Sequence, residues 1–221
     1  MNPPRAGRRL KIIVTAGPTR EKLDPVRFIS NYSTGTMGYE IAREAAGRGH
    51  SVILVSGPAS LPVPKGVRAV AVESALDMKK AILKDFGSAD AVVMAAAVCD
   101  WRPARLSRKK IKKGRDALSL KLVENPDILS GLGRRKGRKA LVGFALETEG
   151  LVRNASSKMK EKNLDFIVAN RPLFGNQKSD FLIIDSRGKV SRYPHYSKKD
   201  LAGGIIDKVE ALCYSSAKYE K

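Results

Sequence analysis

Short apolar runs rich in β-branched residues alternate with longer mixed segments through the first 94 residues of the chain. The apolar runs stop at glycine, proline or polar residues and predict strands at residues 10–16, 51–55, 67–72 and 89–94. The segments between them predict helices at residues 37–49 and 74–86, the second with Ser74 as its N-cap. Such alternation with short connections is typical of a mostly parallel sheet covered by helices.

The regular pattern breaks after residue 95 for about twenty residues, and a long irregular segment in a compact domain is usually functional or mobile. Beyond it the sequence predicts a strand at 118–122, a short helix at 126–132 with Asn125 as candidate N-cap, a strand at 140–145, a helix at 148–163, a strand at 165–169, a hairpin over 181–193 and a closing helix at 198–213. The sequence shows no repeat and no linker. We therefore expect a flexible basic N-terminus at residues 1–9 and one three-layer α/β domain at residues 10–221, with helices on both faces of the sheet and a C-terminal hairpin.

Composition narrows the class of protein. The chain has 42 Lys and Arg against 22 Asp and Glu, a formal net charge of +20, yet 43% of its residues are hydrophobic, which excludes a disordered basic tail. Cys99 and Cys213 are too few for a disulfide framework, and with only two histidines they provide no zinc-binding spacing. No apolar run approaches the roughly 18 residues of a membrane helix. We therefore expect a cytoplasmic protein without a membrane partner.

The surplus of positive charge leaves a nucleic-acid-binding module open as an alternative. Part of the surplus lies in the basic run from Arg108 to Lys113, but aromatic residues make up only 6% of the chain and none interleaves this run as a base-stacking platform requires. The same lysines could be solvated surface, or they could neutralise the charge of a bound triphosphate from a flexible loop.

A loop with glycines precedes the first predicted helix. Ser33, Gly35 and Gly38 would combine backbone N–H groups, a hydroxyl and a helix N-terminus, which suits phosphate, although an ordinary turn with an N-cap has equal weight. An NAD(P)-dependent reductase needs Gly-x-Gly-x-x-Gly directly after the first strand and an acid after the second. The sequence has Gly17-Pro18 and Ser56-Gly57-Pro58 there, so this alternative is disfavoured.

Two further strand ends carry candidate ligand-binding residues. The segment Ala95 to Asp100 has small side chains against which a ring or ribose could lie, and Asp100 could hold Mg²⁺; an Ala-rich packing turn is the alternative. Phe144 lies at the end of the strand at 140–145, where it could stack on a base or pack in the core. Lys158 and Lys162 share one helix face, which is either exposed surface or a phosphate contact.

Seven segments spread over nearly the whole chain carry a family resemblance: 15–21 (Thr-Ala-Gly-Pro-Thr-Arg-Glu), 24–31 (Asp-Pro-Val-Arg-Phe-Ile-Ser-Asn), 95–100, 110–113 (Lys-Ile-Lys-Lys), 125–129 (Asn-Pro-Asp-Ile-Leu), 143–144 and 162–170. Together they resemble phosphopantothenoylcysteine synthetase, also called phosphopantothenate–cysteine ligase, of coenzyme A biosynthesis. The resemblance implies a Rossmann-like homodimer that joins 4′-phosphopantothenate to L-cysteine. CTP would be cleaved to CMP and pyrophosphate through an acyl-CMP intermediate, with Mg²⁺ as cofactor.

The resemblance also implies roles for residues in the matching motifs. Asn31 would hold the acyl-nucleotide intermediate, Arg27 would support that site, and Lys110 would contact the triphosphate. The remaining nucleotide-binding residues would be Met94, Ala95, Ala96, Asp100, Pro126, Asp127, Ile128, Leu129, Phe144, Lys158 and Lys162, with Asp100 also reaching the metal.

The chain departs from the family in two respects. Thr36 stands where the family usually has a phosphate-facing lysine, in Ser-Ser-Gly-Lys-Met-Gly. The bacterial enzyme is often fused behind a flavin-dependent decarboxylase, whereas this sequence contains only the synthetase half. We therefore expect no FMN, and a separate phosphopantothenoylcysteine decarboxylase as partner if the chain is a stand-alone form rather than an excised domain. The sequence leaves CTP against ATP open.

Overall fold

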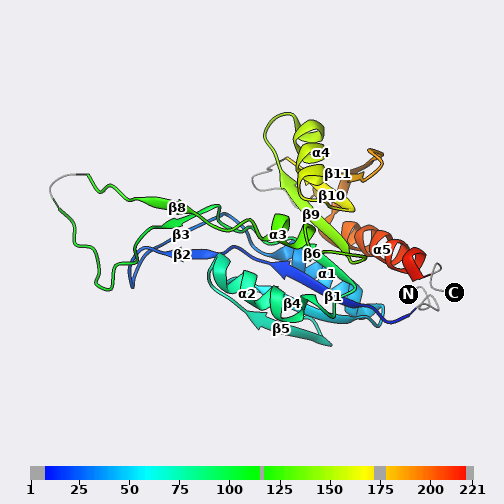
Figure 1. The fold of residues 1–221 in the computed structure, drawn as a ribbon, viewed down its shortest axis with the longest axis horizontal. Helices are drawn as coiled ribbons and strands as arrows, with labels where there is room; N and C mark the ends of the chain where they lie inside the picture. The colour runs from blue at the N-terminus through cyan, green and yellow to red at the C-terminus, as the bar shows by residue number, and fades with distance from the viewer. Residues whose placement is uncertain (1–7, 115–116, 172–177, 218–221) are drawn as a thin grey trace.

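The core of the molecule is one twisted sheet (Figure 1). In the computed structural model, which describes residues 8–114, 117–171 and 178–217, eight strands form this sheet in the order β12-β11-β10-β9-β6-β1-β4-β5. The strands are β1 (Lys11–Ala16), β4 (Ser51–Ser56), β5 (Val67–Ala71), β6 (Ala91–Met94), β9 (Ala140–Leu146), β10 (Phe166–Asn170), β11 (Lys178–Asp185) and β12 (Val190–Ser197). The strands from β10 to β5 are parallel, and β11 and β12 form an antiparallel C-terminal hairpin. The predicted Rossmann-like fold class is confirmed.

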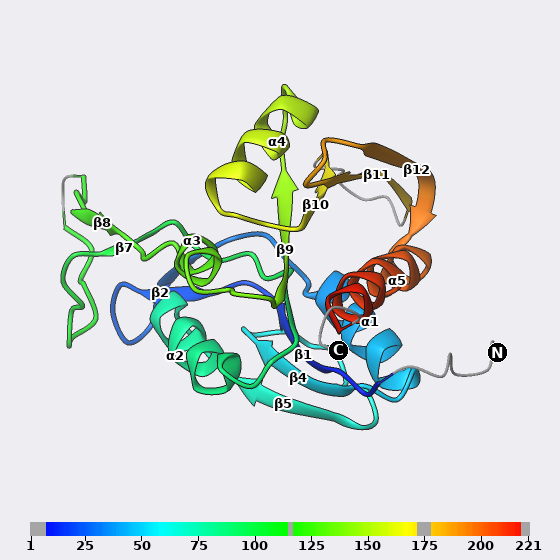
Figure 2. The ribbon, with the colours of Figure 1, turned by 45° about the vertical axis from the view of Figure 1, so that its right-hand side comes forward.

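Helices cover both faces of the sheet (Figure 2). α1 (Thr36–Gly47) and α5 (Lys198–Ala217) pack together on one face, and α2 (Ala75–Phe86), α3 (Ile128–Gly133) and α4 (Leu151–Glu161) cover the other. Each face has its own apolar core, because the central strands bury side chains on both sides: Val14 belongs to the core under α1 and α5, and its neighbour Ile13 to the core under α2. This two-sided burial explains the continuous apolar runs in the sequence.

The helix starts follow local capping chemistry. Ser74 caps α2 as predicted, because its side chain accepts a hydrogen bond from the Asp77 N–H while the Asp77 carboxylate accepts one from the Ser74 N–H. The prediction that Asn125 caps α3 is wrong: Asp127 accepts from the Ser130 N–H at 2.8 Å, and the helix begins at 128. α4 begins at 151 rather than 148, after Gly150 in the left-handed conformation.

Two short ribbons extend from one end of the sheet as an arm, which we define as residues 20–30, 101–114 and 117–124 (Figure 1). β2 (Arg20–Lys22) pairs with β3 (Phe28–Ser30), and β7 (Trp101–Pro103) pairs with β8 (Leu122–Glu124). The predicted strand at 118–122 is therefore wrong: the strand is β8, and it joins this ribbon instead of the main sheet. The pattern misled because leucines spaced two apart at 118, 120 and 122 imitate a half-buried strand, although all three are exposed.

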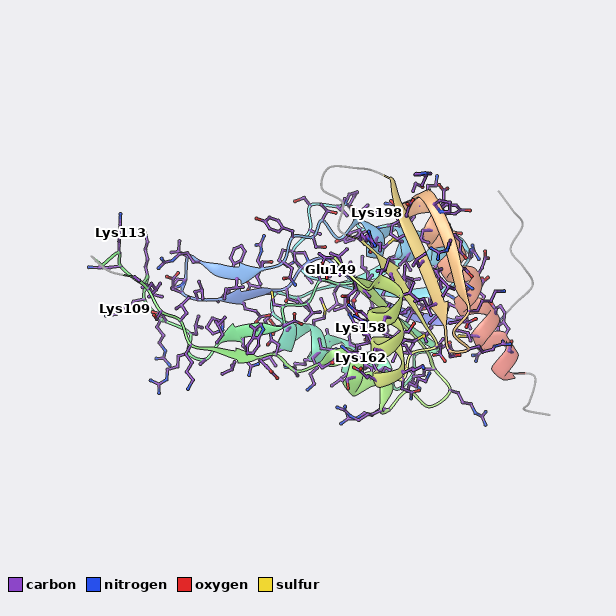
Figure 3. The ribbon with its side chains drawn as sticks, turned by 90° about the horizontal axis from the view of Figure 1, so that it is seen from above. Lys109, Lys113, Glu149, Lys158, Lys162 and Lys198 are labelled. Carbon is purple, nitrogen blue, oxygen red and sulfur yellow. The ribbon has the colours of Figure 1, made fainter. Side chains whose placement is uncertain are left out.

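The described part of the basic loop, residues 108–114, lies at the outer end of the arm. Figure 3 shows Lys109 and Lys113 there, and Lys158 and Lys162 on the body of the molecule. The arm is also where exposed apolar side chains gather, among them Val26, Phe28, Leu106 and Leu118.

The predicted division into a flexible segment at 1–9 and one domain at 10–221 remains a prediction, and residues 1–7 lie outside the described residues. Arg8, the first described residue, forms an ion pair with Asp90. Within the described ranges, no helix has the length and apolar character needed to cross a membrane.

Candidate active site

The candidate site begins at the switch point of the sheet, where the chain order reverses between β1 and β6. Two buried hydroxyls from the β1 side hold the loop after β6: Thr15 Oγ1 accepts from the Ala96 N–H at 3.0 Å, and Thr19 Oγ1 from the Cys99 N–H at 2.9 Å. Both threonines are fully buried. The backbone of residues 95–99 is therefore fixed before any ligand arrives.

Asn31 lies against this same loop. Its Nδ2 donates to the carbonyl oxygens of Val98 at 3.1 Å and Ala97 at 3.3 Å, and the residue is exposed. These hydrogen bonds to the loop after β6 fix the orientation of the amide and place Asn31 next to the edge at which β6 ends.

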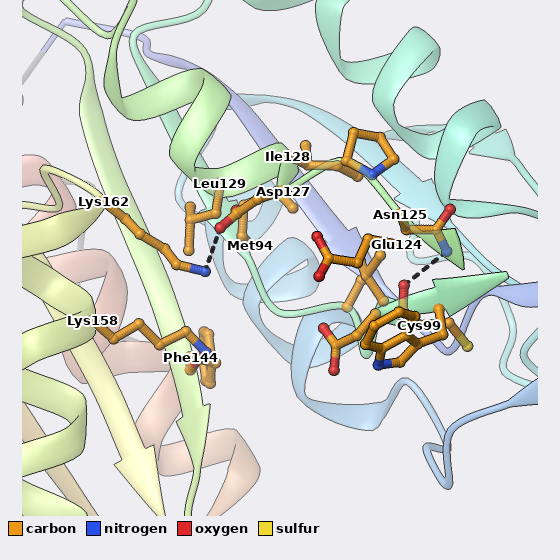
Figure 4. Close-up of a pocket in the computed structure, with 15 residues that line it drawn as sticks. Met94, Cys99, Glu124, Asn125, Asp127, Ile128, Leu129, Phe144, Lys158 and Lys162 are labelled. Atoms are coloured by element: carbon orange, nitrogen blue, oxygen red, sulfur yellow. Dashed lines mark hydrogen bonds and ion pairs between the residues drawn. The ribbon is translucent and has the colours of Figure 1, made fainter. Parts of the chain in front are cut away.

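A pocket of about 330 Å³ opens on the α3 and α4 side of this edge (Figure 4). Its walls come from the β6 loop, the arm root, α3, the end of β9 and α4. The lining residues are Met94, Ala96, Val98, Cys99, Asp100, Trp101, Glu124, Asn125, Pro126, Asp127, Ile128, Leu129, Phe144, Lys158 and Lys162. Ten of the eleven nucleotide-binding positions that the resemblance implies on the body of the molecule are thus brought together, and Ala95 is outside the lining.

Asn125 fixes the geometry of the pocket wall. Its Nδ2 donates to the Cys99 carbonyl at 2.9 Å, and its N–H donates to the Asp100 carbonyl at 2.7 Å (Figure 4). On its other side, Asn125 Oδ1 accepts from Arg102 Nη1 at 3.2 Å. Asn125 therefore links the start of α3 to the loop after β6. Burial raises the pKa of the nearby Cys99 thiol, which keeps it protonated at neutral pH.

Two ammonium groups lie at one end of the pocket, that of Lys158 from α4 and that of Lys162 from the residue that follows α4 (Figure 4). Lys158 Nζ donates to the Phe144 carbonyl at 2.9 Å, and Lys162 Nζ pairs with Asp127 Oδ2 at 2.8 Å. Burial, and then the positive charge of Lys162, lower the pKa of Lys158. Burial raises the pKa of Asp127, but the hydrogen bonds from Lys162 and the Ser130 N–H, together with the charges of Lys162 and Lys158, outweigh it, and that pKa is lowered. This end of the pocket is built to receive negative charge.

The opposite end carries exposed carboxylates. Asp100 and Glu124 are both exposed and line the pocket beside Trp101. Among the described residues, no cluster of three or more His, Cys, Asp or Glu could hold a metal by itself. Mg²⁺ is usually held by one or two carboxylates together with substrate phosphates. Asp100 therefore fits a Mg²⁺ ion held jointly by one carboxylate and the substrate phosphates. The described residues do not fit a metal site made of protein ligands alone.

The predicted phosphate loop lies on the other face, outside the pocket lining. Gly35 has φ +79° and caps α1, and its N–H donates to Ser33 Oγ at 3.3 Å. A Cβ at Gly38 would lie 2.6 Å from the Ala16 Cβ, so glycine there lets α1 pack directly on β1. Thr36, in place of the family lysine, exchanges a 2.7 Å hydrogen bond with Thr34.

Arg27 and Lys110 lie on the arm, away from the pocket lining. The Arg27 guanidinium is bonded to Asp24 and to the Ile111 carbonyl, and Lys110 belongs to the basic loop at the outer end. The sequence did not assign Trp101 or Glu124 to the site, because short ribbon strands leave no periodicity to detect. Asn125 was predicted only as a helix cap, and its signal as a site residue was its place in the family motif at 125–129.

Comparison with known families matches residues 7–212 to the DNA/pantothenate metabolism flavoprotein C-terminal domain. A cysteine/cysteine sulfinic acid decarboxylase from an unknown prokaryotic organism is 42% identical over 218 residues, which cover 96% of this chain and 60% of that protein. The coenzyme A biosynthesis bifunctional protein CoaBC of Bacillus subtilis (strain 168) is 42% identical over 207 residues, which cover 91% of this chain and 51% of that protein. The chain therefore spans only part of the length of these curated relatives.

Among solved structures, the crystal structure of the C-terminal domain of CoaBC superposes with a TM-score of 0.83 at 38% identity, covering 95% of this chain and 98% of that domain. The family match spans nearly the whole chain, and the TM-score shows that this chain and the CoaBC domain share one fold. The chain belongs to the family of the DNA/pantothenate metabolism flavoprotein C-terminal domain.

Proposed function

We propose that this protein is a phosphopantothenate–cysteine ligase that joins 4′-phosphopantothenate and L-cysteine, with CTP cleaved to CMP and pyrophosphate. The observation that carries the proposal is the pocket at the switch point, which combines an apolar floor for a base with the Lys158 and Lys162 ammonium groups for phosphates. Family membership and the likeness to CoaBC, a coenzyme A biosynthesis protein, support the choice of reaction.

The first step would form a bond between the phosphopantothenate carboxylate oxygen and the α-phosphorus of CTP, and would break the bond from that phosphorus to pyrophosphate. Two anions must approach, so Lys158 and Lys162 would lower the repulsion, and the pocket walls would hold the base of the nucleotide beside Phe144. Mg²⁺, held by Asp100 and the phosphates, would neutralise further charge. Asn31 would then hold the acyl-CMP intermediate.

In the second step the cysteine amine would attack the acyl carbon. The C–N bond forms, the bond between the acyl carbon and the oxygen of CMP breaks, CMP leaves, and the amine proton passes to water. The loop of residues 95–99, already fixed by Thr15 and Thr19, would hold the intermediate in one orientation for this attack.

We also propose that two copies of the chain form the working enzyme. Lys110 lies in the chain between Lys109 and Lys113, which Figure 3 shows at the end of an arm that extends away from the body of the molecule, and the arm exposes apolar side chains that a second copy would cover. In a two-fold dimer joined through the arms, Lys110 of one copy would meet the triphosphate in the pocket of the other.

The central test is pyrophosphate release by the purified protein with Mg²⁺, 4′-phosphopantothenate and cysteine, using CTP or ATP in turn. Release with CTP supports the full proposal, release with ATP alone corrects the nucleotide, and no release with either refutes the ligase. With cysteine omitted, one equivalent of pyrophosphate should still appear as acyl-CMP accumulates. Asn31→Asp should change the balance between acyl-CMP formation and its consumption, and unchanged turnover would contradict the role of Asn31.

The dimer is tested by mixing two variants of strongly reduced activity, Lys110→Gln and Lys158→Met. If Lys110 acts on the other copy, each mixed dimer contains one site with both lysines. Half of the dimers in an equal mixture are mixed and each has one working site of two, so about 25% of wild-type activity should return. No recovery after subunit exchange would show that both lysines act within one chain.

A further inference from the structure

Asp24, in the turn between β2 and β3, has a fully buried carboxylate whose two oxygens have different partners. Oδ1 accepts from the N–H groups of Val26 at 2.8 Å and Arg27 at 2.9 Å, which closes the turn. Oδ2 accepts from Arg27 Nε at 3.0 Å, from Arg27 Nη2, and from the Ile111 N–H at 3.1 Å. One oxygen therefore shapes the turn, and the other ties it to the basic loop.

Ile111 is held from both sides. Its N–H is bound by Asp24, and its carbonyl accepts from Arg27 Nη2 at 2.7 Å. These two atoms belong to the successive planar peptides that join Ile111 to Lys110 and Lys112. Fixing both planes fixes the Cα atoms from which the two lysine side chains leave the backbone, because each Cα lies in one of the planes. The Ser107 N–H, which donates to the Leu23 carbonyl at 3.1 Å, holds the start of the same segment.

The contacts of the second oxygen of Asp24, Oδ2, are not needed to form the turn. An Asx turn needs only the Oδ1 contacts, and an asparagine could provide them. The Oδ2 position faces three donors, so it needs an acceptor with full negative charge. The hydrogen bond from Arg27 holds the pKa of Asp24 well below its usual range, and the carboxylate is therefore ionised at neutral pH. In Asp24→Asn the side-chain amide would present its NH₂ to these donors, so this substitution separates the two duties of the residue.

We propose that Asp24 is a positioning residue which, through Arg27 and the backbone of Ile111, directs Lys110 toward the nucleotide triphosphate. This inference rests on the proposed function. It also assigns Arg27 a part in the reaction. Arg27 need not reach the pocket of its own chain, because its guanidinium acts on the basic loop.

The first experiment measures, without any substrate, how firmly Asp24 fixes the basic loop. Trypsin cleaves after Lys and Arg, so the rate of cutting after Lys112 and Lys113 reports how often the loop leaves its place. In Asp24→Asn this rate should rise by about tenfold relative to cuts elsewhere. Ile111→Pro removes one N–H donor and leaves Asp24 intact, and it should have a similar effect even if Asp24→Asn folds poorly. The matched control is Asp165→Asn, because Asp165 also binds one backbone N–H and one cation, at Leu141 and Lys136 on the body.

The second experiment asks whether Asp24 acts through Lys110. We expect kcat/KM for the nucleotide to fall about 10- to 100-fold in Asp24→Asn, because small misplacements of a positioned charge have effects of this size. Adding Asp24→Asn to Lys110→Gln should lower kcat/KM little further, since the lysine to be positioned is already gone. Asp165→Asn should lower it independently of Lys110 if it has any effect.

The outcomes separate the inference from the function. If folded Asp24→Asn and Ile111→Pro are cut by trypsin at the wild-type rate, the claim that Asp24 fixes the basic loop is refuted, whatever the activity. Faster cutting with fully additive kinetic losses would overturn the action through Lys110. An inactive wild-type protein would refute the ligase, while the trypsin rates would still decide whether Asp24 holds the loop.

Discussion

The arm predicts a specific weak point of the proposed dimer. Leu118 is 57% exposed in the single chain and belongs to the segment that leads from the basic loop into β8. Burial of a whole leucine side chain is worth about 1.5–3 kcal/mol. With somewhat more than half of its surface available, Leu118 would contribute about 1–1.5 kcal/mol on association. In a two-fold dimer the same contact occurs twice, so Leu118→Asp should weaken association by about 2–3 kcal/mol.

That loss corresponds to a dimer dissociation constant about 30- to 150-fold higher, since each 1.4 kcal/mol is a factor of about ten. Burial of an unpaired carboxylate in the contact would add to it. The constant is measured by sedimentation over a range of protein concentrations, together with specific activity at the same concentrations. Activity should fall where the variant is monomeric, because each pocket then lacks a Lys110 from the other copy.

Val152→Asp is the control, since Val152 is also an exposed apolar residue but lies in the first turn of α4, where an acid agrees with the helix dipole. It should dimerise like the wild type. A wild-type protein that is monomeric at micromolar concentration yet active would refute the reasoning, and so would a Leu118→Asp variant with an unchanged dissociation constant.

Three further predictions concern the body of the molecule. Lys158→Met should weaken CTP binding, as measured by calorimetry. In the wild type, kcat/KM for CTP should fall with rising pH at values below the ordinary lysine pKa of 10.5, because the pKa of Lys158 is lowered. This fall should be absent from the variant. Glu210→Ala should destabilise the fold by about 3 kcal/mol in urea unfolding, because the buried Nε2 of His50 loses its partner at 2.9 Å and Arg48 loses one of its carboxylates. Ser74→Ala should cost about 1 kcal/mol at pH 7. Part of this cost comes from the hydrogen bond that the Ser74 hydroxyl donates to the Asp77 carboxylate at 2.7 Å, which lowers the pKa of Asp77. That part is present above the unfolded-state pKa and should disappear as pH falls through the folded-state value, so an equal cost at all pH values would contradict this hydrogen bond.

The sequence was sufficient for the central strands of the main sheet because they are buried on both sides. Runs such as residues 12–14 are apolar at every position, and a continuous apolar run between helical segments has few alternative structures. The position of the pocket could be anticipated for a related reason: parallel strands bring their carboxyl ends to one edge, so Met94 and Phe144 line one pocket although they are far apart in the chain.

The arm could not be predicted in the same way, because its strands have only three residues each and are stabilised by contacts between segments distant in sequence. β2 and β3 were not anticipated at all. Asp24 looks like a common turn residue in the sequence, and only the fold brings Ile111 to its second oxygen. Asn125 looks like a helix cap for the same reason, although its side chain binds the Cys99 carbonyl.

The lysines proposed to bind the triphosphate lie in two separate places, Lys158 and Lys162 in the pocket and Lys110 on the arm, and this separation affects the electrostatic cost of the empty site. Lys158 and Lys162 stand in the pocket, where burial and mutual repulsion already lower the pKa of Lys158, so a third ammonium group fixed beside them would meet a higher electrostatic cost in the empty site. Lys110 on the arm avoids that cost, because it is exposed until a triphosphate supplies the opposite charge. In the proposed dimer the full set of cations is therefore assembled only when an anionic nucleotide is present to hold it, and the strength of that assembly should fall steeply with salt.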